Sequence, residues 1–239
     1  MKKLSETMKE ELCPYAAAVV LGGGSGTRFG GDKLLAPLGG VPVLVHSLRA
    51  FEACDMIREI VVVCRGEQLE ATAALCETYG IGKVTAIVPG GSTRLLSSLS
   101  GVSAVSSRAE LVAVHDGARP LVTERILRDA LWESHRHIAA VPAVPVRDTI
   151  KTARDTVVTD TPDRRTLFAV QTPQCFRREV LLGALTSAVE NAPEVTDDSM
   201  AVERIGGRIY LTEGSEENIK ITTPLDLDLA ELIVKRRNT

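Results

Sequence analysis

A run of glycines with two basic residues has the residue types that most directly suggest chemistry in this chain. Residues 22–31 hold six glycines, and Arg28 and Lys33 lie within and just after that run. Because glycine has no side chain, a glycine-rich loop leaves backbone N–H groups open to an anion. Two positive charges add to that attraction, so the loop predicts a phosphate-binding site.

Two common phosphate-binding patterns do not fit this loop. A P-loop needs a glycine before its lysine and a Ser or Thr after it, whereas Lys33 lies between Asp32 and Leu34. The dinucleotide-binding fingerprint needs a glycine three residues after Gly26, where this chain has Phe29. The loop therefore indicates another kind of phosphate or nucleotide site.

The elements that position this loop alternate between apolar runs and helical patterns. We expect strands at 16–21, 57–64, 84–88, 111–114 and 138–144, and helices at 43–53, 68–79, 95–102 and 123–135. This alternation predicts an α/β fold with a Rossmann-like, doubly wound and mostly parallel sheet. Ligands bind such sheets outside the carboxyl ends of the strands. The glycine loop, the Gly90-Gly91 loop and the loop at Asp116 all follow strands, so we expect them to converge.

The alternation stops between Val146 and Phe168. This stretch is polar, is rich in β-branched residues and has no helical pattern, and a long structureless loop is uncommon in a compact domain. We therefore expect a β-arm at 146–168 that protrudes from the body. Beyond it we expect helices at 177–191, 197–205 and 224–237 and strands at 209–212 and 218–221. The predicted organisation is an N-terminal extension at 1–14 and a single domain at 15–239.

Composition excludes several classes of protein. The 239 residues include 28 Lys plus Arg and 31 Asp plus Glu, a net charge of −3 that lacks the basic footprint of a nucleic-acid binder. No apolar run is long enough for a membrane span, and the first residues have no signal-peptide pattern. The five cysteines are scattered and form no C-x-x-C pair, which favours reduced thiols and a cytoplasmic location.

Five further motifs follow the glycine loop along the chain. They are His115-Asp116-Gly117-Ala118-Arg119-Pro120, Pro145-Val146-Arg147-Asp148-Thr149-Ile150-Lys151, Gln171-Thr172-Pro173-Gln174, Thr196-Asp197-Asp198 and Glu217-Asn218-Ile219-Lys220-Ile221-Thr222. Together with the loop they resemble the 2-C-methyl-D-erythritol 4-phosphate cytidylyltransferase family of the non-mevalonate isoprenoid pathway. The resemblance extends from about Ala16 to Arg237, nearly the whole chain.

The resemblance implies a reaction in which CTP and methylerythritol phosphate give the CDP-alcohol and pyrophosphate, with Mg²⁺ or another divalent cation as cofactor. The acceptor phosphate is already an anion and needs no general base. The chemical demand is to hold two repelling anions in line and to neutralise the charge that develops. Lys, Arg and Mg²⁺ meet this demand in phosphoryl transfer. The resemblance also implies a homodimer formed through the arm.

The resemblance assigns roles to individual residues at matching positions. The residues that match catalytic positions are Arg28, Lys33, Arg164 and Lys220. Those that match CTP-binding positions are Gly22, Gly23, Gly24, Gly26, Gly91, Ser92 and Ser97. Those that match acceptor-binding positions are Asp116, Arg119, Thr149 and Thr196. In the family, arm residues such as those matched by Thr149 and Arg164 reach the acceptor phosphate in the neighbouring subunit. No metal ligand is assigned.

The spacing of the loop cations departs from the family pattern. Arg28 and Lys33 are separated by Phe29-Gly30-Gly31-Asp32, whereas the family usually has a longer loop that continues through Pro-Lys-Gln. The shorter form is similar to molybdopterin guanylyltransferases, and Gln-Thr-Pro-Gln is shared with ribitol-5-phosphate cytidylyltransferases. A non-catalytic nucleotide-binding module on the same fold is a further alternative. We expect His115 to serve packing and loop hydrogen bonding, and Arg94 is left without a role.

Overall fold

Apolar segments form the central sheet, because strands buried on both faces need apolar side chains throughout. The computed structural model describes residues 14–23, 29–191 and 194–237. In these residues the main sheet has eight strands, in the order β10-β7-β11-β6-β1-β4-β5 with β12 also paired to β7. The strands are β1 (Ala16–Leu21), β4 (Ile57–Cys64), β5 (Val84–Pro89), β6 (Leu111–Asp116), β7 (Ala139–Pro145), β10 (Phe168–Val170), β11 (Gln174–Arg177) and β12 (Tyr210–Glu213).

The strands β6, β1, β4 and β5 are mutually parallel, which confirms the predicted doubly wound sheet. The chain winds outward from β1 in both directions, with β4 and β5 on one side and β6 on the other. Such a reversal opens a crevice at the carboxyl ends of the strands, where open α/β sheets bind ligands. Leu21 and Asp116 are register partners at the ends of β1 and β6, and they mark this place.

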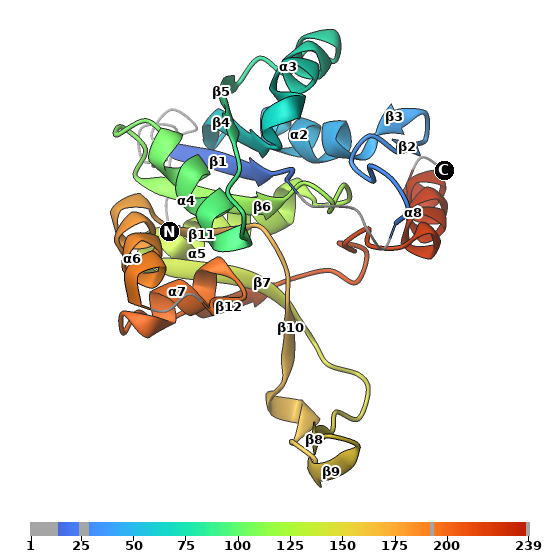
Figure 1. The fold of residues 1–239 in the computed structure, drawn as a ribbon, viewed down its shortest axis with the longest axis vertical. Coiled ribbons are helices and arrows are strands. Elements are labelled where there is room, and N and C mark those ends of the chain that lie inside the picture. Colours follow the sequence, from blue (N-terminus) through green and yellow to red (C-terminus); the bar gives the residue numbers. More distant parts are fainter. Residues whose placement is uncertain (1–13, 24–28, 192–193, 238–239) are drawn as a thin grey trace, which may run out of the picture.

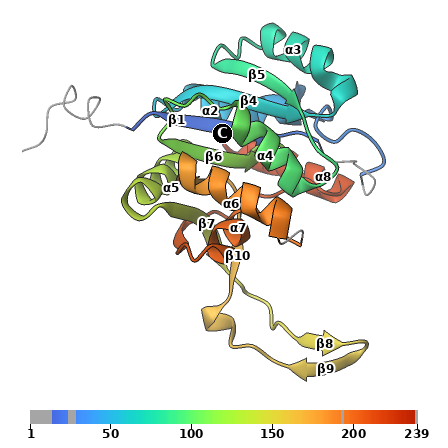
Figure 2. The ribbon, with the colours of Figure 1, turned by 60° about the vertical axis from the view of Figure 1, so that its left-hand side comes forward.

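Helices cover both faces of the sheet (Figures 1 and 2). Ala18 and Val20 of β1 pack in the cluster that includes α2, α5 and α8, whereas Ala17 and Val19 pack in the cluster with α4, α6 and α7. The helices are α2 (Val43–Ala53), α3 (Leu69–Thr78), α4 (Arg94–Ala104), α5 (Glu124–His137), α6 (Arg178–Asn191), α7 (Asp198–Arg204) and α8 (Pro224–Arg237). Among the described helices, none is long and apolar enough to cross a membrane.

The polar segment after β7 leaves the body as an arm, as expected (Figure 1). Its tip is the antiparallel pair β8 (Thr152–Arg154) and β9 (Val157–Asp160), followed by a 3₁₀ turn, η2 (Arg164–Thr166). Strand β10 then returns along the end of β7. At the tip, Val157 and Val158 are 67% and 55% exposed, which is unusual for large apolar side chains that neighbour each other.

Two strands of the main sheet were not expected from the sequence, nor was the short separate pair β2 (Pro37–Leu38) and β3 (Val41–Pro42). Strand β11 inserts antiparallel between β6 and β7, and β10 pairs antiparallel with β7. Strand β10 has only three residues, all exposed, and β11 has four residues directly after Pro173. Such short segments lack an alternation long enough to be recognised.

The strand expected at 218–221 is wrong. The side-chain amide of Asn218 is buried and donates to Gln171 Oε1 and to the Thr172 carbonyl oxygen, at 3.2 and 3.0 Å. The Ile221 N–H donates to the Ala118 carbonyl oxygen at 2.8 Å. The segment is therefore held by side-chain and loop hydrogen bonds, and it forms no ladder.

Candidate active site

A cavity of about 390 Å³ lies at the ends of β1 and β6, where the winding of the sheet reverses. Small-molecule sites typically measure about 300–1,000 Å³. The glycine loop, the turn before α4, the end of β6 and the segment before α8 all contribute to its wall. Of the residues predicted from sequence, those that line it are Gly23, Lys33, Gly91, Ser92, Ser97, Asp116 and Lys220.

The turn from β5 into α4 forms one wall of the cavity. A Cβ atom on Gly91 would lie 2.3 Å from Cβ of Leu96, so only glycine fits there. The Thr93 hydroxyl oxygen caps α4 by accepting from the Leu96 N–H at 3.1 Å, and the Ser97 hydroxyl donates to the Thr93 carbonyl oxygen at 2.9 Å. These contacts fix Ser92 and Ser97 on the cavity wall.

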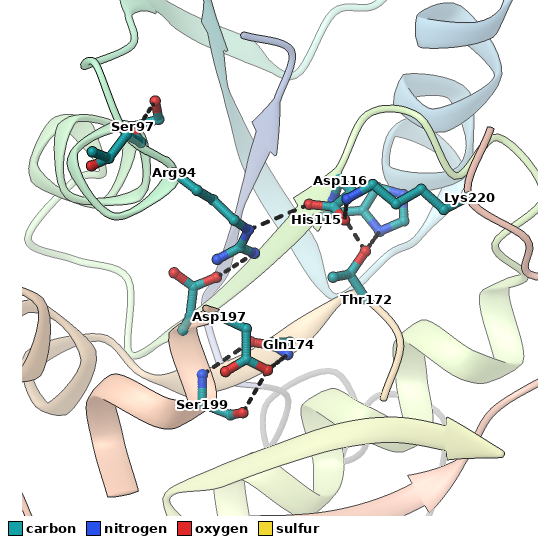
Figure 3. A network of polar contacts seen from close by, with 11 residues as sticks. Arg94, Ser97, His115, Asp116, Thr172, Gln174, Asp197, Ser199 and Lys220 are labelled. Carbon is teal, nitrogen blue, oxygen red and sulfur yellow. Dashed lines mark hydrogen bonds and ion pairs between the residues drawn. The ribbon is translucent and has the colours of Figure 1, made fainter. Parts of the chain in front are cut away.

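Four charged side chains meet beside the cavity, three of them labelled in Figure 3. Lys220 Nζ lies 2.7 Å from Asp116 Oδ2, and Arg94 Nε lies 3.7 Å from Asp116 Oδ1. Arg94 Nη2 also lies 2.8 Å from Oδ2 of Asp198, a carboxylate that is only 1% exposed. These ion pairs join β6, α4, α7 and the segment before α8.

The neighbouring cations keep Asp116 ionised. Burial alone would raise its pKa, but the charges of Lys220 and Arg94 outweigh burial and lower the pKa to about 2. For Arg94, burial lowers the pKa, and the carboxylates of Asp198 and Asp116 more than offset that effect, so the pKa is raised. The site therefore holds a fixed carboxylate between two fixed cations at neutral pH.

His115 lies directly behind Asp116 and is fully buried. The Asp116 N–H donates to Thr172 Oγ1 at 3.0 Å, and Thr172 Oγ1 lies 3.1 Å from His115 Nδ1. Because His115 Nε2 faces the Arg119 carbonyl oxygen at 3.2 Å, it carries the proton and Nδ1 accepts. Burial lowers the His115 pKa to about 4, which agrees with this neutral form. These are the packing and loop contacts expected for His115.

The segment that carries Lys220 is held from behind by the Asp116 loop. Arg119 Nη1 donates to the Asn218 carbonyl oxygen at 2.7 Å, and Ala118 accepts from the Ile221 N–H. The guanidinium of Arg119 thus contacts the backbone two residues before Lys220, and Arg119 does not line the cavity. Its predicted contact with the acceptor stays a prediction.

Helix α7 is clamped to β11 near the cavity (Figure 3). The Gln174 side-chain amide donates to Asp197 Oδ2 at 2.7 Å, and its oxygen accepts from the Ser199 N–H at 3.0 Å. This clamp fixes Asp198, which faces Arg94. Thr196 precedes α7, is exposed and does not line the cavity.

The other predicted residues fall in different places. Gly22 is buried directly after β1, and its N–H donates to the Val63 carbonyl oxygen at 2.6 Å. Thr149 and Arg164 are exposed on the arm, and neither lines the cavity of its own chain. Arg28, Gly24 and Gly26 lie outside the described residues.

Sequence reasoning left two charged residues without a role. Arg94 lines the cavity and contacts both acidic groups, and Asp198 lies 1% exposed with Arg94 against it. A signal was present for each of them. Arg94 closely follows the Gly90-Gly91 loop, and Asp198 ends the Thr-Asp-Asp motif.

Known proteins resemble this chain over most of its length. One curated relative, the 2-C-methyl-D-erythritol 4-phosphate cytidylyltransferase of Caldanaerobacter subterraneus subsp. tengcongensis, is 43% identical over 92% of this chain and 99% of its own. The enzyme of that name from Symbiobacterium thermophilum is 45% identical over 92% of each chain.

Solved structures show the same likeness. The 4-diphosphocytidyl-2C-methyl-D-erythritol synthase of Anaerococcus prevotii superposes with a TM-score of 0.84 at 27% identity, covering 95% of this chain and 99% of that one. The cytidylyltransferase of Thermus thermophilus gives 0.76 at 31% identity, covering 91% and 98%. A family model matches residues 16–236. The chain belongs to the 2-C-methyl-D-erythritol 4-phosphate cytidylyltransferase family.

Proposed function

We propose that this cavity is where the chain transfers CMP from CTP to 2-C-methyl-D-erythritol 4-phosphate, with release of pyrophosphate. The observation that carries the proposal is the meeting of Lys33, Lys220 and Asp116 in one cavity with the Gly91–Ser97 turn. The ammonium groups can pair with the phosphates of both substrates, and the carboxylate can accept hydrogen bonds from substrate hydroxyl groups. The family to which the chain belongs performs this reaction in isoprenoid precursor synthesis.

The residues act mainly by holding charge in place. The acceptor phosphate attacks the α-phosphorus of CTP, an α-phosphate P–O bond forms, and the bond to the leaving pyrophosphate breaks. Lys33, together with Arg28 of the same loop, stabilises negative charge as it develops on the phosphoryl oxygens. Asp116 fixes Lys220 at 2.7 Å, so that this ammonium needs no reorientation when the substrates arrive.

A divalent cation fits the site as a partner of the triphosphate. No group of three or more potential metal-binding side chains occurs in the described residues. Asp116 is an ionised carboxylate on the cavity wall, and Mg²⁺ commonly uses one or two carboxylates together with substrate phosphates. Both oxygens of Asp116 already face Lys220 and Arg94, so we propose that the triphosphate supplies most of the ligands of Mg²⁺, which would neutralise charge when bound.

Substrate choice can be tested by measuring pyrophosphate release. We expect turnover with CTP and methylerythritol phosphate, and none above background when CTP is replaced by ATP, GTP or UTP or the acceptor by ribitol 5-phosphate or molybdopterin. Activity should disappear with EDTA and return with excess Mg²⁺. Turnover with GTP and molybdopterin, or no turnover in any combination with Mg²⁺, would contradict the proposal.

We further propose that the domain at 15–239 works as a homodimer, in which each arm completes the acceptor site of the other subunit. Arg164 Nη1 donates to the Arg147 carbonyl oxygen at 2.9 Å, and this contact fixes the exposed guanidinium on the arm. The arm also exposes Val157, Val158 and Phe168. Exchange across a two-fold axis would bury both copies of this apolar surface.

We also propose a cytoplasmic location, which agrees with the free thiols of Cys54, Cys64, Cys76 and Cys175.

Subunit mixing tests the exchanged arm. Lys33→Ala and Arg164→Ala dimers should each be impaired. After random exchange half of the dimers are mixed and half of their sites are intact, so about one quarter of wild-type activity should return. Arg165→Ala serves as the control, because Arg165 is exposed and pairs with Asp163 within its own turn. A monomer by sedimentation, or no recovery of activity after verified exchange, would show that Arg164 does not act in the site of the other subunit.

A further inference from the structure

The shortened loop before Lys33 is held by a carboxylate that the family resemblance does not assign. Asp32 Oδ2 accepts from Arg65 Nη2 at 2.9 Å and from Gln68 Nε2 at 2.5 Å. Arg65 Nε also donates to Gln68 Oε1 at 3.0 Å, so each of the three side chains contacts the other two. Arg65 directly follows β4, and Gln68 ends the 3₁₀ turn η1 (Gly66–Gln68) before α3. Asp32 therefore fastens the segment next to Lys33 to the connection between β4 and α3.

The same carboxylate also shapes the turn that contains Lys33. Asp32 Oδ1 accepts from the Leu34 N–H at 3.1 Å, and the Asp32 carbonyl oxygen accepts from the Leu35 N–H at 3.2 Å. On the far side, the Leu34 carbonyl oxygen accepts from the Leu44 N–H at 3.0 Å, and the Leu34 side chain is 7% exposed. The backbone is thus fixed on both sides of Lys33, whose side chain lines the cavity.

We propose that Asp32 is a positioning residue that holds Lys33 in the cavity. This inference rests on the proposed function of Lys33. Two glycines precede Asp32, and Gly30 has φ +78°, so the preceding backbone restrains Lys33 little. A displacement of about 1 Å at a reacting group can lower the rate about 100-fold. The carboxylate is therefore placed to affect turnover although it does not line the cavity.

A double-mutant cycle tests this inference. Asp32→Ala should lower kcat about 10- to 100-fold with little change in KM for CTP. In a Lys33→Ala background the same change should have almost no further effect, because the group that Asp32 positions is gone. Asp32→Asn keeps an oxygen for the Leu34 N–H and loses the charge toward Arg65, so its kcat should be intermediate.

The matched control is Glu67→Ala. Glu67 Oε1 lies 3.6 Å from Arg65 Nε and is a carboxylate on the same arginine, but its side chain is 71% exposed. It should leave kcat unchanged. If the losses of kcat in Asp32→Ala and Lys33→Ala multiply in the double variant, the inference is overturned. It is also overturned if high Mg²⁺ restores the kcat of Asp32→Ala, because Asp32 would then be a metal ligand. Absence of wild-type turnover with CTP and methylerythritol phosphate would instead refute the proposed function.

Discussion

Replacing Lys33 by alanine should lower kcat by roughly 10²–10³, as does the loss of a group that stabilises charge in the transition state. Lys33 lines the cavity, next to where the glycine loop leaves β1. Negative charge on the α-phosphoryl oxygens and on the leaving pyrophosphate is larger in the transition state than in bound CTP. An ammonium held there therefore lowers the barrier more than it strengthens substrate binding, and KM for CTP should change little.

Steady-state kinetics of pyrophosphate release check this expectation. Lys83→Ala is a suitable control, because Lys83 precedes β5 at the opposite end of the strands and donates to the Cys54 carbonyl oxygen at 2.8 Å. Arg28→Ala should behave as Lys33→Ala does if both loop cations act on developing charge. A rise in KM with kcat unchanged would show uniform binding of ground and transition states.

The sequence was sufficient for most of the fold. The predicted strands 16–21 and 57–64 and the predicted helices 43–53 and 224–237 have the observed bounds. Strand 16–21 is a continuous apolar run that ends at Gly22, strand 57–64 contains the apolar run 60–63, and the two helices begin at or directly after a proline. Such patterns depend only on local sequence. The convergence of three loops on one site also followed from local patterns, because parallel strands present their carboxyl ends at one edge.

Contacts between distant segments could not be predicted in the same way. Strand β11 joins the sheet between β6 and β7 through pairing that its four residues do not reveal. Arg94 and Asp198 meet because α4 and α7 cover the same face of the sheet. The ion-pair partner of a charged residue cannot be identified from the sequence alone when it lies far along the chain. The sequence alone therefore assigns no role to Arg94, whereas the fold places Asp116 and Asp198 against it.

The contacts of Arg94 predict a large effect on stability. Asp198 is 1% exposed, and Arg94 is its ion-pair partner in the described structure. Removing one member of a buried ion pair leaves the other charge uncompensated and typically costs about 3–5 kcal/mol. Arg94→Met, which keeps an apolar stem of similar length, should lower the free energy of unfolding by about 3 kcal/mol, at the lower end because Arg94 is partly exposed.

A second variant separates stability from the function of the site. Adding Asp198→Leu to Arg94→Met removes the stranded carboxylate and should restore most of the stability, since apolar replacement of a whole buried pair is often neutral. Asp116 lacks its second cation in both variants, so in both of them KM for the acceptor should rise more than KM for CTP. Urea unfolding measures the recovery of stability, and steady-state kinetics measure the two KM values.

The control is Arg128→Met. Arg128 pairs with the exposed Asp55 and Glu124, so its replacement should lower the free energy of unfolding by at most about 1 kcal/mol. Equal destabilisation by Arg94→Met and Arg128→Met would show that Asp198 does not depend on Arg94.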